Sequence, residues 1–218
     1  MTPAPHDLYA EALRRPDRLR AHCDDGTVLA LPVERWLRTP DAIEHALLAR
    51  ARPPVLDVGC GPGRHVLALA ERRIPALGID SSAAAVAIAR RRGAAVLRAS
   101  VFKGVPLPRC WRTALLLDGS IGIGGDAVAL LARVALLLRA DGEALVEVEG
   151  RGTPSRLVTA RLELAGRRSR PFAWARVGWD GVEELGQAAG FALAERWSAG
   201  GRCFVRLRRE DAAALAAT

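Results

Sequence analysis

The stretch VLDVGCGPGRHV at residues 55–66 constrains the fold of this chain more than any other part of its sequence. The apolar run over 55–58 predicts a buried strand, and apolar residues at helical spacing follow from Arg64. Between them Gly59, Gly61 and Gly63 alternate with other residues, so the turn carries few side chains and tolerates positive φ. A strand, a glycine turn and a helix in direct succession bring a ligand close to the backbone. The sequence therefore predicts an open α/β sheet with a ligand site at this turn.

The rest of the chain continues the alternation of short apolar strands and helices. Strands that are separated by helices pair in parallel. We predict a Rossmann-like, doubly wound, mostly parallel sheet with helices on both faces and an antiparallel C-terminal strand. The predicted strands are 55–58, 74–79, 95–101, 114–117 and 144–148, with 191–197 and 203–207 as the terminal antiparallel pair, and the predicted helices include 64–72, 127–139 and 182–189.

Two segments depart from the alternation of strands and helices, one before the predicted sheet domain and one within it. Residues 1–52 predict helix and loop, with a helix that begins after Asp41, a natural N-cap. Residues 53–218 form the predicted sheet domain. Alternating residues near 156–176 predict an antiparallel hairpin inserted after the fifth strand.

Charge and cysteine content narrow the class of protein. The formal net charge is +8, but Lys103 is the only lysine and the arginines are scattered with few aromatic residues between them. This composition disfavours nucleic-acid binding. The four cysteines contain no C-x-x-C pair, which argues against a zinc site, and we predict no metal. The N-terminus lacks the features of a signal peptide, and no apolar stretch is long enough to span a bilayer, so we expect a cytoplasmic protein.

Two classes of cofactor use a turn of this kind. Dinucleotide binders need a small residue at the last position of G-x-G-x-x-G/A, where this chain has Arg64, and the third glycine comes one position earlier. The carboxylate of Asp57 would also repel a pyrophosphate, whereas a cationic or zwitterionic ligand would be accepted. A nicotinamide-dependent oxidoreductase is therefore the less favoured alternative. The N-terminus of the helix at Arg64 further predicts free N–H groups for an anionic part of the ligand.

The motif Asp57-Val-Gly-Cys-Gly-Pro-Gly63 resembles the first motif of the class I S-adenosylmethionine-dependent methyltransferases, and the resemblance extends over about residues 53–149. It implies S-adenosylmethionine as the cofactor and residues 1–52 as a lid over it. Asp80 matches the acidic residue that this family uses on the ribose, and a carboxylate is able to accept both bonds of a vicinal diol. The cofactor-binding residues that the resemblance implies are Asp57, Gly59, Cys60, Gly61, Gly63, Asp80, Ser81, Ser100, Val101, Asp118 and Gly119.

Two candidate catalytic residues each have a second interpretation. His65 begins the helix beside the glycine turn and is either a general base or a packing residue. Asp118 ends the fourth predicted strand and either lines the mouth of the active site or caps the loop before Gly119. His22 and Tyr9, in the N-terminal segment, are further candidates to face the acceptor.

The resemblance implies in-line displacement at a sulfonium methyl group. Asp118-Gly-Ser-Ile stands where methyltransferases of exocyclic base amines in DNA carry Asn/Asp-Pro-Pro-Tyr, so a nucleic-acid base is disfavoured as the acceptor. We predict a bacterial enzyme that methylates a small molecule, has no membrane partner, and has a homodimer as its candidate assembly. The alternative is an RNA methyltransferase or a basic nucleic-acid binder.

Overall fold

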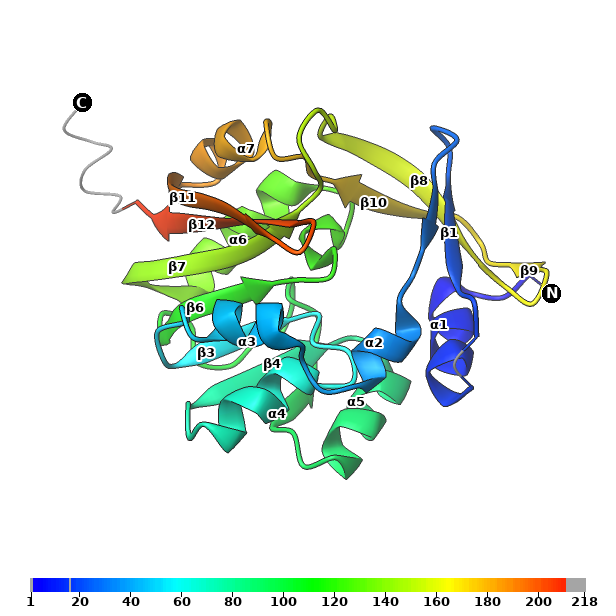
Figure 1. Cartoon of the computed structure of the whole chain (residues 1–218), viewed down its shortest axis with the longest axis horizontal. Helices are drawn as coiled ribbons and strands as arrows, with labels where there is room; N and C mark the ends of the chain where they lie inside the picture. The colour runs from blue at the N-terminus through cyan, green and yellow to red at the C-terminus, as the bar shows by residue number, and fades with distance from the viewer. Residues whose placement is uncertain (1, 16, 211–218) are drawn as a thin grey trace.

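The computed structural model describes residues 2–15 and 17–210 and contains a seven-stranded sheet flanked by helices (Figure 1). The strands at one side of this sheet pair in parallel, and the last two pair antiparallel. The fold class predicted from the sequence is confirmed. Across the sheet the order is β11 (Phe191–Ala199), β12 (Arg202–Arg209), β7 (Leu138–Val148), β6 (Trp111–Leu116), β3 (Val55–Val58), β4 (Ala76–Asp80) and β5 (Val96–Arg98).

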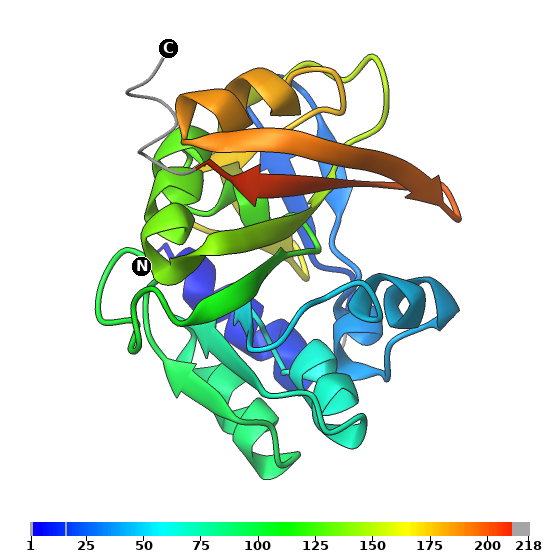
Figure 2. The ribbon, with the colours of Figure 1, turned by 90° about the vertical axis from the view of Figure 1, so that its left-hand side faces the viewer.

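Alternate residues of the central strands face two separate helical layers. Leu56 of β3 packs in one hydrophobic cluster with α6 (Ala127–Leu137) and α7 (Val182–Ala188). Its neighbour Val55 packs in another with α3 (Ala42–Leu48) and α4 (Arg64–Glu71). Figure 2 shows α6 and α3 on opposite sides of the sheet. This division follows from the period-two alternation of side chains along a strand.

Local sequence signals account for where several helices begin. Asp126 accepts a hydrogen bond from the N–H of Ala129 at the start of α6, and Ser82 does the same for Ala85 at the start of α5 (Ala83–Arg91). Asp41 and Glu44 form a reciprocal capping box at α3. Such side chains bind N–H groups that have no partner within the helix. The caps thus fix the residues at which these helices begin.

A second, antiparallel sheet lies beside the first, with the order β10 (Phe172–Arg176), β8 (Arg156–Leu164), β1 (Arg20–Cys23) and β2 (Val28–Ala30), and with the short β9 (Arg167–Arg168) paired to β8. Its β8–β10 hairpin lies where the sequence places one. The N-terminal segment differs from the sequence prediction, because it contributes β1 and β2 as well as α1 (Pro5–Arg14) and α2 (Val33–Leu37). These two strands are very short, and β1 is held by pairing with β8, which is distant in the sequence.

The second sheet is joined to the main domain through α1. Leu8 and Ala12 of α1 share a hydrophobic cluster with Leu162 of β8 and with Ala85 of α5. Figure 1 shows α1 below the second sheet, on the side of the molecule that carries α2 and α5. None of the helices in the described part of the chain has both the length and the apolar character that crossing a bilayer requires.

Candidate active site

A cavity of about 580 Å³ lies between the carboxyl ends of the main-sheet strands and one face of the second sheet. This volume falls within the range of small-molecule sites, roughly 300–1,000 Å³. Most of the residues that the sequence predicts as site residues line this one cavity. They are Asp57, Gly59, Cys60, Gly61, His65, Asp80, Ser81, Ser100, Val101, Asp118 and Gly119.

The glycine turn is held by its own backbone N–H groups. Those of Gly59 and Cys60 donate to the carbonyl of Ile79 at 2.9 and 3.0 Å, and that of Gly63 donates to the carbonyl of Cys60 at 3.0 Å. The N–H of Gly61 donates to Asp80 Oδ2 at 2.9 Å. These bonds occupy the N–H groups of the turn itself, whereas the free N–H groups that the sequence predicts for an anion belong to the start of α4. The carboxylates of Asp57 and Asp80, which also line the cavity, favour a cationic group beside the turn.

Gly63 is the one predicted cofactor residue that does not line the cavity. It precedes α4 with a φ of +80°, and a Cβ at this position would lie 2.9 Å from Ala94 Cβ and 3.0 Å from Ala89 Cβ. Gly61 contrasts with it, since a Cβ there would point at Tyr9 and lie 3.2 Å from its hydroxyl oxygen. The two glycines of the motif thus have different physical roles. Gly63 allows α4 to pack against α5, and Gly61 leaves space beneath α1.

Asp80 connects the glycine turn to the start of α5. Its Oδ1 accepts from the N–H of Ser82 at 2.7 Å, while its Oδ2 accepts from Gly61. Burial raises the pKa of this carboxyl, and the two backbone donors oppose that shift. Each carboxylate oxygen has further acceptor capacity, so Asp80 is able to bind donors on a ligand in the cavity. Ser81, next to it, also lines the cavity.

A buried charge cluster occupies one end of the site, beneath α2 and α3. Its members come from three helices (α2, α3 and α4), from three strands (β3, β7 and β12) and from the end of β6. Arg64 is 2% exposed and donates to Glu44 and to Asp118. Arg202 donates to Glu147 at 2.8 Å and to Glu44 at 3.1 Å, and Arg35 of α2 donates to Asp118. The cluster consists of Arg35, Glu44, Asp57, Arg64, His65, Asp118, Glu147 and Arg202.

His65 lies inside this cluster with both ring nitrogens directed at carboxylates. Its Nδ1 is 3.6 Å from Asp57 Oδ2, and its Nε2 is 3.7 Å from Glu44 Oε1. Burial alone would lower the pKa of the imidazole, but Asp57 and Glu44 raise it to about 9. At neutral pH the ring is therefore protonated, and a protonated imidazole is unable to accept a proton from an acceptor molecule. Of the two interpretations of His65, this geometry favours the packing residue.

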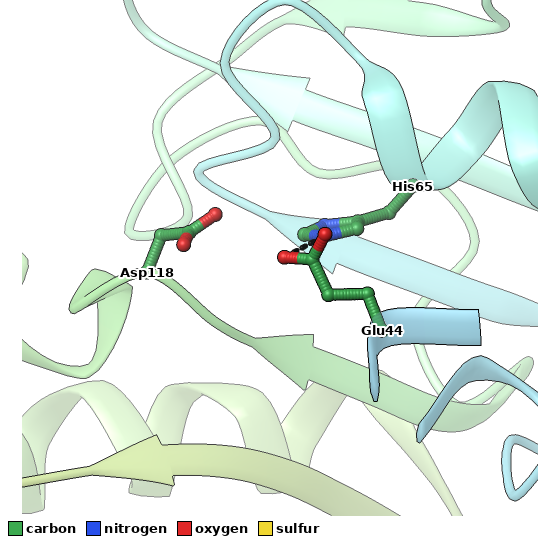
Figure 3. Close-up of side chains that lie close together, drawn as sticks. All are labelled: Glu44, His65 and Asp118. Atoms are coloured by element: carbon green, nitrogen blue, oxygen red, sulfur yellow. Dashed lines mark ion pairs between the residues drawn. The ribbon is translucent and has the colours of Figure 1, made fainter. Parts of the chain in front are cut away.

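Asp118 follows β6 with a φ of +54° and points its carboxylate at arginines. Burial would raise its pKa, but Arg64 and the neighbouring cations hold the pKa of this carboxyl below its usual range. Figure 3 shows Glu44, His65 and Asp118 converging from α3, α4 and the end of β6. One ligand atom from each of these three residues lies within 4.8 Å of the others, as in a metal site. Both carboxylates are already neutralised by arginines of the chain, so we assign no metal here.

The sequence did not identify Arg35, Glu44, Glu147 or Arg202 as site residues. The position of Glu147 near the end of a strand, like that of Asp57 and Asp118, could have indicated that it faces the site. The arginine at position 64, where dinucleotide binders carry a small residue for helix packing, could have indicated that acidic partners lie nearby. Arg35 and Arg202 gave no local signal, because only the tertiary fold brings them together.

The other end of the cavity has a different character. One face of the second sheet supplies two cross-strand rows, Phe172–Ala160–Cys23 and Leu162–Ala21–Leu29. All six of these residues line the cavity, as do the aromatic rings of Tyr9, Trp36 and Trp174. We call the six residues of the two rows the apolar wall.

Arg176 lies at the border of the apolar wall, and each of its three guanidinium nitrogens donates to a neighbouring side chain. Its Nε and Nη2 donate to the two oxygens of Glu149 at 2.7 and 2.6 Å. Its Nη1 donates to Asp25 at 3.0 Å and to Thr27 at 2.8 Å. These bonds join β10, the end of β7 and the β1–β2 hairpin. Arg176 therefore closes the cavity here and offers no free charge to a ligand.

Sequence comparison gives one match. Residues 55–142 match the family model of a methyltransferase domain. No curated protein matches the chain in sequence. The matched region contains the glycine turn, Asp80, Ser100 and Asp118.

Several solved structures share the fold. A SAM-dependent methyltransferase from Bacteroides fragilis, solved with S-adenosyl-L-homocysteine, is 23% identical, with 96% of each chain covered and a TM-score of 0.75. The CcbJ methyltransferase from Streptomyces caelestis is 17% identical, covering 95% of this chain and 99% of that one, with a TM-score of 0.64. The 1,6-didemethyltoxoflavin-N1-methyltransferase from Burkholderia thailandensis is 24% identical, covering 78% of this chain and 76% of that one, with a TM-score of 0.56. The first two matches extend over the second sheet as well as the main domain.

Proposed function

We propose that this chain is a class I S-adenosylmethionine-dependent methyltransferase and that it transfers a methyl group to a small-molecule acceptor inside the cavity described above. The observation that carries this proposal is the position of the cavity. It joins the glycine turn and Asp80 at one end to the apolar wall at the other. A cofactor and an acceptor bound in these two parts would meet near Asp118 and Gly119.

The residues of the glycine turn fit the cofactor. A Cβ at Gly59 would lie 2.9 Å from Ile123 Cδ1, so only glycine leaves the turn open beside the loop after β6. Asp57 Oδ2 is buried and accepts no hydrogen bond from the described residues, and its charged neighbour His65 Nδ1 lies 3.6 Å away. The oxygen therefore keeps acceptor capacity for an ammonium group nearby. When bound, S-adenosylmethionine supplies an electrophilic methyl group on a positively charged sulfur. The Bacteroides fragilis and Burkholderia thailandensis proteins were both solved with the demethylated product of this cofactor.

The remaining cofactor contacts are assigned by position. Asp80 would accept hydrogen bonds from the ribose hydroxyls, with Ser81 beside it. Ser100 and Val101, after β5, would flank the adenine. The Oγ of Ser100 already accepts from the N–H of Phe102 at 3.3 Å, and Val101 is 4% exposed, so packing contributes much of this part of the site.

In this proposal the chain acts mainly by orientation. His65 and Asp118 are both held in ion pairs, so neither is placed as a free base. We assign them to positioning: they fix the loop after β6 and the start of α4 around the reacting groups. Holding two reactants in line is able to contribute roughly 7–11 kcal/mol of the barrier.

Residues 1–52 act in this proposal as a lid. Tyr9 of α1 lies over Gly61, and its ring contacts Trp36 of α2 edge-on, with centroids 5.9 Å apart. Arg35, next to Trp36, forms an ion pair with Asp118 and so ties α2 to the main sheet. A lid in this position excludes water from the reacting groups.

The size of the cavity, about 580 Å³, favours a small molecule over RNA as the acceptor. Two similar structures carry names that indicate small acceptors, namely the didemethyltoxoflavin enzyme and the sugar N-methyltransferase KedS8. A bacterial origin and a cytoplasmic location remain predictions from the sequence.

Isothermal titration calorimetry tests this function. The chain is titrated with S-adenosylhomocysteine and, separately, with NAD. We expect saturable one-to-one binding of the first and no saturable heat from the second. Preferential binding of NAD would contradict the proposal and favour an oxidoreductase.

A further inference from the structure

We propose that the apolar wall is the acceptor subsite and that it selects an uncharged, largely apolar acceptor over one that carries a phosphate or carboxylate. This inference rests on the proposed function, because it concerns the second ligand of the same cavity. Three observations carry it: the composition of the wall, its small central residues, and the pairing of every charged side chain around it.

The composition of the wall follows from strand register. In the order β8, β1 and β2, Leu162, Ala21 and Leu29 stand opposite one another, and Phe172, Ala160 and Cys23 form the next row. Because side chains alternate along each strand, these residues share one face of the sheet. The opposite face carries His22, Arg161 and Glu163 instead. The sheet therefore directs its apolar face into the cavity and its charged face away from it.

The centre of the wall is made of small side chains. Ala160 and Ala21 lie between larger residues, Phe172 and Cys23 in one row and Leu162 and Leu29 in the other. Both alanines line the cavity. Ala160 and Ala21 are 2% and 6% exposed, so the small side chains lie at the bottom of the wall, below the half-buried Phe172. The space above them suits a flat or compact apolar group.

The cations that line the cavity are not free to bind an anionic acceptor. Arg64 and His65 contact carboxylates of the charge cluster, and Arg176 has Glu149, Asp25 and Thr27 as partners. His6, at the start of α1, is exposed and lies 3.4 Å from Asp7. A phosphate or carboxylate on the acceptor would therefore lose its hydration without gaining a buried, unpaired cation among the described lining residues.

Two acidic residues at the end of β7, which line the cavity, give a matching argument against a cationic acceptor. Glu149 is engaged by both nitrogens of a bidentate bond from Arg176, and Glu147 is engaged by Arg202 in the same way. A cationic acceptor would have to displace these arginines. An uncharged acceptor leaves all four residues paired.

The test uses three probes that share one ring system: 1-naphthol, 1-naphthyl phosphate and 1-naphthylmethylammonium. Each is titrated into the full chain at pH 7, with S-adenosylhomocysteine present at saturation. We expect 1-naphthol to bind at least about tenfold more tightly than either charged probe, because the charged groups would be desolvated without a partner. Equal or tighter binding of a charged probe, or no binding of 1-naphthol, would overturn the inference.

Variants of the wall locate the bound probe. Ala160→Leu fills the space above the small side chains, and we expect it to weaken 1-naphthol binding at least about tenfold while S-adenosylhomocysteine binds as before. Thr159→Leu, on the exposed outer face of the same strand, is the matched control and should change neither affinity. If Ala160→Leu fails to fold, Ala21→Leu fills the neighbouring row. Unchanged 1-naphthol affinity in a folded filling variant would place the probe elsewhere and contradict the inference.

The result separates the two proposals. If the unmodified chain fails to bind S-adenosylhomocysteine, the proposed function is wrong. If it binds S-adenosylhomocysteine but shows no preference for the neutral probe, only the acceptor class is wrong.

Discussion

The two ends of the cavity are built on opposite physical principles. At one end, buried carboxylates and arginines from seven different parts of the chain neutralise one another around Arg64. At the other, the second sheet presents an apolar face, with Arg176 bonded to Glu149 and Asp25 at its border. A substitution at the charged end should lower the stability of the fold strongly, because each buried ion depends on its partners. A substitution in the apolar wall leaves no ion unpaired and should lower stability less, which suits the part of the site that we propose to select the acceptor.

Replacing Arg64, the central residue of the charge cluster, should give the largest loss in the free energy of unfolding. Arg64→Met keeps most of the side-chain volume but leaves Glu44 and Asp118 without their shared cation. We expect the free energy of unfolding to fall by about 3–5 kcal/mol, the cost of breaking a buried ion pair from one side. Urea denaturation measures this change.

The matched control for this variant is Arg38→Met. Arg38 pairs with Glu34 on α2, but both side chains are largely exposed. We expect a change of about 0.5 kcal/mol or less. Similar losses in the two variants would mean that the buried cluster contributes no more than a surface pair.

The pH dependence of stability gives a second measure of the same cluster. The pKa of His65 in the folded chain is about 9, above its ordinary value of 6.5. Its contribution to stability is therefore complete below about pH 6.5 and is lost as the pH rises through 9. We expect the unmodified chain to lose on the order of 3 kcal/mol more than His65→Gln between pH 6 and pH 10. Parallel pH profiles for the two proteins would show that His65 is not held as an imidazolium.

The cofactor half of the cavity is examined by Asp80→Asn. The amide keeps the size of the side chain but removes the charged acceptor that faces the cavity. Hydrogen bonds to charged groups contribute about 1.5–3 kcal/mol, so we expect S-adenosylhomocysteine affinity to fall roughly 10- to 100-fold. Calorimetry measures the affinity, and Asp126→Asn is the control, since it alters only the N-cap of α6. Unchanged affinity in Asp80→Asn would remove the ribose assignment.

The smallest effect on S-adenosylhomocysteine affinity is expected at Gly63, the motif glycine that lies outside the cavity. Gly63→Ala adds a Cβ against Ala94 and Ala89 at a positive φ. We expect little change in S-adenosylhomocysteine affinity. The free energy of unfolding should fall by about 1–2 kcal/mol from the left-handed backbone, and by roughly 1–3 kcal/mol more because neither alanine Cβ is able to move without its backbone. A large loss of affinity with normal stability would mean that Gly63 contacts the cofactor directly.

The same comparison explains what the sequence was able to predict. Strands β3 and β4, the glycine turn and Asp80 follow one another closely in the chain, so local periodicity and spacing were enough to place them. The apolar wall could not be placed in this way, because β1 has four residues and depends on pairing with β8. The roles of His65 and Asp118 were also hidden. They depend on Glu44, Arg35 and Arg202, which only the tertiary fold brings to them.

The boundary between α6 and β7 also depends on pairing with a distant strand and could not be placed from the local sequence. The sequence predicted a helix to residue 139 and a strand from 144, with Ala140-Asp141-Gly142 between them. In the structure the helix ends at Leu137, and β7 starts at Leu138. Pairing with β6 through Trp111 extends the strand into a segment whose local composition favours a turn.

The most direct test is a crystal structure of the chain with S-adenosylhomocysteine bound. We expect the ribose hydroxyls within hydrogen-bond distance of the Asp80 carboxylate, the amino group beside Asp57, and the apolar wall left open beyond the sulfur. A nucleoside bound against the apolar wall, or outside the cavity, would contradict the assignment of the two ends.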